Sequence, residues 1–128
     1  MILADSSALI AFLKDENPLA DAVMEARARG QLVTNVIVRY EVLVGEHRIF
    51  DRARRLLNGL QCRILDFRTA ERAIEAARAL QRKGGPGAIG KRDTLIAGIA
   101  LAYGDEVLTG NREHFDRVEG LKVHPAST

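Results

Sequence analysis

Short apolar runs alternate with longer helical stretches along the chain, and this alternation constrains the fold more than any other feature. The runs at residues 2–4, 31–34, 62–65 and 106–109 predict buried strands, and a run at 121–123 predicts a fifth. Strands that are separated by helices favour a parallel sheet with helices on its faces. The sequence therefore predicts an α/β fold: a single domain over residues 1–128, with a central parallel sheet of four to five strands flanked by helices on both faces.

The helical stretches have recognisable ends. The first is expected to run from Ser6 or Ser7, one of which caps it, to residue 13, and others are expected at 19–29, 36–44, 48–58, 69–83 and 93–103. Asn35 is a candidate cap for the helix at 36–44, and Asp93 for the helix at 93–103. Residues 84–90, GGPGAIG, form a loop by composition.

Composition narrows the class of protein. The 128 residues are 47% apolar, which is enough for a hydrophobic core. The chain has 19 basic and 17 acidic residues, and the formal charge of +2 permits a polyanionic partner without indicating one. Cys62 is the single cysteine, which excludes an intrachain disulfide and a cysteine-rich metal site. The sequence contains neither a signal peptide nor an apolar run of membrane-spanning length, so we expect a cytoplasmic protein that does not enter a membrane.

Polar residues follow two of the expected strands, at the edge where parallel sheets bind ligands. Asp5 follows the first strand and Asn111 the fourth. Glu41 lies within the apolar stretch VIVRYEVLVG, either as a buried carboxylate or on the wet side of a half-buried helix. Asp93 is either a helix cap or a ligand, and capping leaves its second oxygen free. Asn111 is either a ligand or a simple turn residue.

The types of these residues indicate a kind of metal site. The three histidines, at positions 47, 114 and 124, have no i,i+4 pair, so a zinc site is not expected. Acids that come from separate strand and helix ends offer oxygen ligands alone, which suit Mg²⁺ or Mn²⁺. Such an ion supports hydrolysis of a phosphodiester, which is the leading chemical hypothesis.

Four fragments carry a resemblance to a known family: ILADSSALIAFL, YEVLVG, RDTLIAGIA and VLTGNREHF, in this order along the chain. Together they resemble PIN-domain ribonucleases, and most closely the VapC toxins of toxin–antitoxin pairs. The resemblance implies a metal-dependent endoribonuclease that hydrolyses RNA with a metal-activated water and leaves a 5′-phosphate and a 3′-hydroxyl. It implies that Asp5, Glu41 and Asp93 are catalytic and bind Mg²⁺ or Mn²⁺, with Asp5 and Asp93 as the main ligands.

The resemblance assigns further roles. Asn111 is a fourth candidate catalytic residue; it stands where the family often has an acid, which favours one firmly held ion. His114 stands at another place where an acid is common. Supporting hydrogen bonds to the carboxylates are expected from Ser6, Ser7 and Thr109, and Glu113 is expected in an outer supporting role. RNA contacts are expected from Lys91, Arg92 and Arg112.

Partners follow from the same resemblance. Family members form homodimers and are inhibited by a VapB-type antitoxin. The apolar faces of the helices at 36–44 and 48–57 are either dimer surfaces or core, and the loop at 84–90 is a candidate contact for substrate or antitoxin.

Other functions remain open. The same fold could serve as a binding or regulatory module with weak catalysis, which the Asn at position 111 supports and the three acids oppose. Aspartyl phosphotransfer of the haloacid-dehalogenase type needs a second acid two residues after Asp5, where Ser7 stands. A receiver domain needs paired acids at the N-terminus, and Asp5 stands alone.

Overall fold

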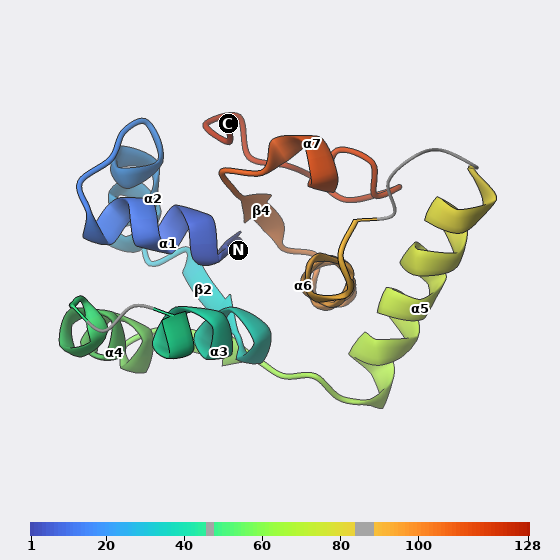
Figure 1. The fold of residues 1–128 in the computed structure, drawn as a ribbon, viewed down its shortest axis with the longest axis horizontal. Helices are drawn as coiled ribbons and strands as arrows, with labels where there is room; N and C mark the ends of the chain where they lie inside the picture. The colour runs from blue at the N-terminus through green and yellow to red at the C-terminus, as the bar shows by residue number, and fades with distance from the viewer. Residues whose placement is uncertain (46–47, 84–88) are drawn as a thin grey trace.

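The computed structural model describes residues 1–45, 48–83 and 89–128. Within these residues, four strands form one parallel sheet in the order β3-β2-β1-β4: β1 (Ile2–Ala4), β2 (Leu32–Asn35), β3 (Gln61–Arg63) and β4 (Glu106–Leu108). The helices are α1 (Ser6–Leu13), α2 (Leu19–Ala28), α3 (Val36–Gly45), α4 (Phe50–Asn58), α5 (Phe67–Arg82), α6 (Lys91–Tyr103) and α7 (Arg112–Phe115) (Figure 1). The predicted α/β class and the parallel sheet are confirmed.

The core lies between the sheet and the helices. Leu3, Val33 and Val107, one from each of three neighbouring strands, are fully buried, as expected for a parallel sheet that helices flank. Helix α5 lies at the edge of the molecule and packs across α6, which Figure 1 shows end-on. None of the helices in the described segments has both the length and the apolar character that a membrane span requires.

Two predicted strands differ from the structure. The fifth strand is reduced to a single parallel bridge between Val107 and Val123. The third strand ends at Arg63, and the apolar residues Ile64 and Leu65 leave the sheet and are exposed. The loop predicted at 84–90 lies outside the described residues, apart from positions 89 and 90.

Helix caps also differ in part from the prediction. Asp5, rather than Ser6 or Ser7, caps α1, because its carboxylate accepts the Ala8 N–H at 3.0 Å. Asn35 caps α3 as predicted, accepting the Val38 N–H at 2.8 Å. Helix α6 begins at Lys91 after Gly90, so Asp93 lies in its first turn and is not the cap. An acid in the first turn is favoured by the same helix dipole that favours an acidic cap, so the local pattern does not separate the two positions.

The sheet topology brings distant parts of the sequence together. From the central strand β1, the chain adds β2 and β3 on one side and then returns to add β4 on the other. Ligands bind at such a reversal, beyond the carboxyl ends of the strands. Asp5 follows β1 and Thr109 follows β4, and the Asp5 N–H donates to the Leu108 carbonyl at 3.0 Å.

Candidate carboxylate pocket

Asp5 is buried at the carboxyl end of β1, with 4% of its surface exposed. One carboxylate oxygen accepts hydrogen bonds from the Ser7 hydroxyl and the Ala8 N–H, and the other accepts one from the Thr109 hydroxyl. Burial raises the pKa of Asp5, these three donors partly offset it, and the charge of Asp93 raises it further. The donors fix the orientation of a carboxylate that is costly to ionise.

Thr109 and Ser7 join the ends of β1 and β4. The Thr109 hydroxyl accepts the Asn111 N–H at 2.8 Å, and the Ser7 hydroxyl accepts the Gly110 N–H at 2.8 Å. A Cβ at Gly110 would stand 3.1 Å from the Ser7 oxygen, so this close approach favours glycine. Ser7 and Thr109 are therefore placed as expected, as donors to Asp5.

The C-terminal segment holds Thr109 from the other side. The Thr109 N–H donates to the Ser127 hydroxyl at 3.0 Å, and its carbonyl accepts the Thr128 N–H at 3.0 Å. Ser127 is buried. No motif in the sequence places this segment beside the pocket, because one hydroxyl and one backbone N–H make its contacts with Thr109 across 18 or more positions of the chain.

Glu41 points from α3 into the same region. Its Oε2 lies 3.4 Å from Nη1 of Arg92, and its Oε1 is buried with no hydrogen-bond partner among the described residues. Burial is the main cause that raises the pKa of Glu41; the guanidinium of Arg92 lowers it, and the charges of Asp93 and Asp5 raise it. Glu41 is thus the half-buried carboxylate that the sequence proposed, and not a residue of the wet side of the helix.

A second polar group of the pocket consists of Asp93, Asn111 and His114. Oδ2 of Asp93 lies 3.0 Å from Nδ1 of His114 and 3.5 Å from Nδ2 of Asn111, and the two nitrogens lie 2.8 Å apart. His114 reaches this position because the first turn of α7 bonds its N–H to the Asn111 carbonyl. The spacing of the histidines predicted no zinc site and gave His114 no role in the pocket. Two signals were available: His114 stands where the family commonly has an acid, and it lies three residues after Asn111.

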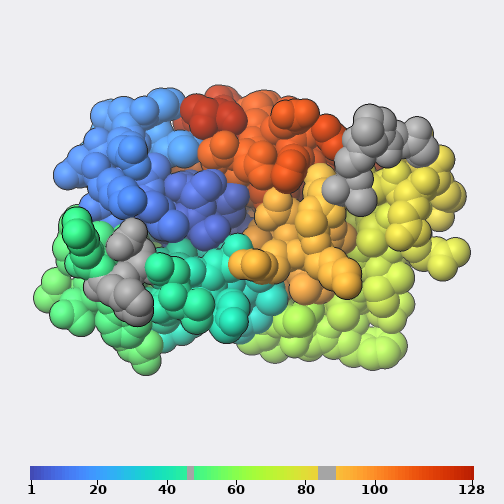
Figure 2. All heavy atoms as spheres, viewed as in Figure 1, coloured from blue at the N-terminus to red at the C-terminus, as the bar shows by residue number. Residues whose placement is uncertain are grey.

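These residues meet in the middle of one face of the molecule. Figure 2 shows the start of α1 (dark blue), α3 (teal), the start of α6 (amber) and the segment after β4 (orange) in contact there. Across the described ranges, no three His, Cys, Asp or Glu side chains stand in a metal-holding arrangement. The donor set nevertheless fits a hard cation, because three mutually repelling carboxylates include a buried oxygen that lacks a donor. Asp5, Glu41 and Asp93 are the residues that could hold it.

Other residues predicted for the site are placed differently. Glu113 is turned away, because its carboxylate pairs with Arg117 at 3.0 Å and its side chain is 81% exposed. Arg112 is engaged with Asp116 and with the His124 carbonyl, so its guanidinium is committed within the fold. In the part of the chain that the structure describes, the Ser6 hydroxyl makes no hydrogen bond to the carboxylates. Lys91 and Arg92 are exposed at the start of α6 beside the pocket.

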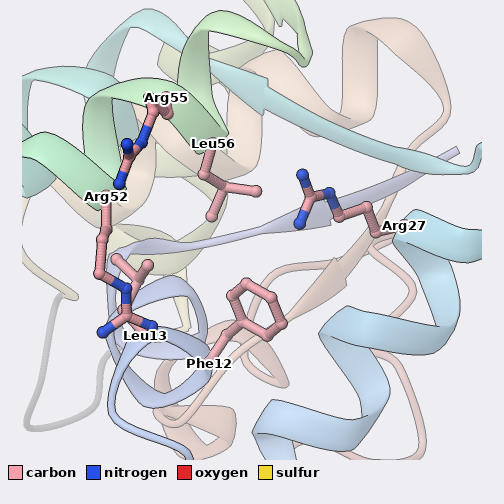
Figure 3. Close-up of a pocket in the computed structure, with 6 residues that line it drawn as sticks. All are labelled: Phe12, Leu13, Arg27, Arg52, Arg55 and Leu56. Atoms are coloured by element: carbon pink, nitrogen blue, oxygen red, sulfur yellow. The ribbon is translucent and has the colours of Figure 1, made fainter.

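A cationic hollow lies at the far end of α1. It has a volume of about 270 Å³ and is lined by side chains of α1, α2 and α4: Phe12, Leu13, Arg27, Arg52, Arg55 and Leu56 (Figure 3). The three arginines form no ion pair or hydrogen bond with any residue of the described segments. Within the described residues, the surface therefore combines apolar side chains with three positive charges that no acid pairs.

Comparisons with known proteins relate the whole chain to one kind of fold. A model described as the PIN domain matches residues 2–121. A search of curated proteins finds no match. The solved structure of VapBC2 from Rickettsia felis, bound to a DNA fragment from its promoter, is similar with a TM-score of 0.79 at 20% identity, over 97% of this chain and 98% of that chain. A toxin–antitoxin complex from Klebsiella pneumoniae has a TM-score of 0.79 at 21% identity over 100% of both chains. A DNA-bound VapBC from Salmonella typhimurium has a TM-score of 0.76 at 21% identity over 96% of both chains.

Proposed function

Since the chain belongs to the PIN-domain family, we propose that it is a metal-dependent endoribonuclease of the VapC toxin type. The observation that carries the proposal is the meeting of Asp5, Glu41 and Asp93, from three different elements, at the reversal of the sheet. Burial and the charge of Asp93 raise the pKa of both Asp5 and Glu41, and carboxylates that are costly to ionise without a counter-charge favour binding of a divalent cation such as Mg²⁺ or Mn²⁺.

The side chains divide the work of hydrolysis. Asp5 and Asp93 would hold the cation, and the hydroxyls of Ser7 and Thr109 would keep Asp5 oriented toward it. The cation would make water a stronger nucleophile and neutralise charge on the phosphodiester. Oε1 of Glu41 has no other partner in the described structure, and it would orient the attacking water and accept its proton.

Cations at the mouth of the pocket would contact the RNA backbone. Lys91 and Arg92 begin α6 two positions and one position before Asp93, and both are exposed. Arg92 also lies beside Glu41, so phosphate binding would compete with this weak ion pair. We do not extend this role to Arg112, which is held by Asp116.

A protein partner of the VapB antitoxin type is part of the proposal. The similar structures from Rickettsia felis and Salmonella typhimurium are VapBC complexes. The hollow of Arg27, Arg52 and Arg55 matches a partner segment that places carboxylates beside an apolar anchor. The double substitution Arg52→Glu and Arg55→Glu should weaken binding of the co-expressed antitoxin by tenfold or more, measured by calorimetry; unchanged affinity would place the antitoxin elsewhere.

RNA cleavage by the purified, antitoxin-free protein tests the nuclease proposal. With Mn²⁺, we expect cleavage of RNA but not of DNA of the same sequence, with 5′-phosphate and 3′-hydroxyl ends. EDTA, Asp5→Asn and Asp93→Asn should each abolish it. Asp21→Asn removes an acid from α2, outside the pocket, and should leave it unchanged. Cleavage that survives EDTA or both pocket variants would refute the assignment, and intact RNA with a folded, metal-loaded protein would favour a binding module.

A further inference from the structure

The contacts among Asp93, Asn111 and His114 form a closed triangle of polar atoms. Its sides are 3.0 Å from Asp93 Oδ2 to His114 Nδ1, 2.8 Å from His114 Nδ1 to Asn111 Nδ2, and 3.5 Å from Asn111 Nδ2 to Asp93 Oδ2. The three residues come from α6, from the segment after β4 and from α7. Each atom therefore faces the other two, although the residues belong to separate elements.

Hydrogen bonds cannot satisfy this triangle as it is drawn. Nδ1 of His114 would have to accept a hydrogen from the Asn111 amide and donate one to Asp93, and a single ring nitrogen does one or the other. Turning the Asn111 amide by half a turn exchanges its nitrogen for Oδ1, and amide orientation is assigned from such networks. The side chains then present two oxygens and one ring nitrogen to a common point.

The dimensions of the triangle suit a metal ion. Two neighbouring ligands of an octahedral ion with bonds of about 2.1 Å stand about 3.0 Å apart, and the measured sides are 3.0, 2.8 and 3.5 Å. We propose that His114 Nδ1, Asp93 Oδ2 and Asn111 Oδ1 occupy one face of the coordination shell of a divalent cation. His114 is then a metal ligand that determines which metal the pocket selects.

A nitrogen ligand changes the selectivity of the pocket. Carboxylate and carbonyl oxygens suit Mg²⁺, whereas imidazole favours transition-metal ions. The inference rests on the proposed function for the presence of a cation near Asp93, and adds that His114 shifts the preference from Mg²⁺ toward Mn²⁺ or Co²⁺.

Pulsed electron paramagnetic resonance of the Mn²⁺-loaded full chain tests this inference directly. We expect modulation of the Mn²⁺ echo by a coordinated ¹⁴N nucleus in the wild type, and ¹⁵N modulation when histidine is ¹⁵N-labelled. His114→Glu, which keeps an oxygen ligand, should remove it. His124→Gln is the matched control and should keep it, because His124 bonds to the Ala126 N–H of the C-terminal segment.

Competition between Mn²⁺ and Mg²⁺ gives a second reading. The dissociation constant for Mg²⁺ divided by that for Mn²⁺ should fall by about tenfold in His114→Glu. Substitutions around metal sites commonly change metal affinity by about this factor. His114→Gln should move this ratio in the same direction, and it serves if circular dichroism shows that His114→Glu does not fold.

The outcomes separate this inference from the proposed function. Mn²⁺ binding that depends on Asp5 and Asp93 but shows no nitrogen modulation, or an unchanged metal preference in His114→Glu, would overturn the role of His114 and leave the carboxylate pocket standing. Absence of Mn²⁺ binding to the wild type would overturn both.

Discussion

Asp5 caps a helix and belongs to the carboxylate pocket at the same time. One of its oxygens accepts the Ala8 N–H at the start of α1, and the other accepts the Thr109 hydroxyl across the end of the sheet. Local helix formation thus orients the same side chain that the pocket uses. Burial raises the pKa of Asp5 despite these donors, so ionisation of this one carboxyl disfavours the metal-free fold at a pH above its raised pKa.

Replacement of Glu41 by Gln should stabilise the metal-free protein at neutral pH. Because the pKa of Glu41 is raised by burial, its ionised form disfavours folding above that pKa, and the neutral amide removes this effect. We expect a melting temperature a few degrees above wild type at pH 7, with loss of RNA cleavage. The difference should shrink as the pH falls through the raised pKa toward 4.5, the ordinary value for Glu. A lower melting temperature at pH 7 would show that Glu41 is stabilised as a carboxylate.

Thr109→Val should weaken metal binding without changing the shape of the pocket. Valine keeps the size of threonine but removes the hydroxyl that donates to Asp5 and accepts the Asn111 N–H. We expect Mn²⁺ affinity to fall by about 10- to 100-fold in calorimetry. Thr34→Val, at an equally buried position in β2, is the control and should retain affinity. Equal Mn²⁺ affinity in the two variants would show that the Thr109 hydroxyl does not support the pocket.

At the scale of elements, the contact between α5 and α6 depends on one glycine. A Cβ at Gly98 of α6 would clash with the Ala73 Cα of α5, which is backbone and cannot move aside alone. Gly98→Ala should therefore reduce the free energy of unfolding by about 3 kcal/mol. Gly45→Ala, at the end of α3, where an added Cβ would meet no described residue within 4 Å, should not reduce the free energy of unfolding. Denaturant unfolding of both variants tests this prediction. Equal free energies of unfolding would mean that α5 and α6 can move apart at little energetic cost.

Most elements could be predicted from the sequence, and their ends less well. Apolar runs and flanking polar residues located β1, α3 and α6, because these signals are local. The expected fifth strand is reduced to a single bridge between Val123 and Val107. The length of such a pairing depends on the partner strand and not on the local apolar run. Asp93 as the cap of α6 was a wrong prediction, because an Asp is favoured both at the cap and in the first turn of a helix.

At the scale of the whole molecule, the sheet topology assembles the pocket. Strand order brings Asp5 and Thr109 together although 104 positions separate them in the sequence. The resemblance named Asp5, Glu41 and Asp93, but the contacts of His114 with Asp93 and of Ser127 with Thr109 join residues 18 or more positions apart, which no local pattern encodes. The pairing of Arg112 with Asp116 has i,i+4 spacing and was open to prediction.

The exposed side of α3 suggests how two copies associate. Tyr40 and Val44 are 61% and 60% exposed, whereas Ala53, Leu56 and Leu57 of α4 are buried in the core, so α3 offers the more accessible apolar face for a second copy. We expect a homodimer in light scattering that becomes a monomer with the pair Tyr40→Glu and Val44→Glu. Phe67→Glu changes an exposed apolar residue of α5 and should leave the dimer intact. A dimer that survives the α3 substitutions would use another surface.

The central claim is that Asp5 and Asp93 hold a divalent cation, and calorimetric titration of the metal-free protein with Mn²⁺ tests it most directly. The account predicts saturable binding in the wild type and in Asp21→Asn, and its loss in Asp5→Asn and in Asp93→Asn while both variants remain folded. Undiminished Mn²⁺ binding in these two variants would contradict it.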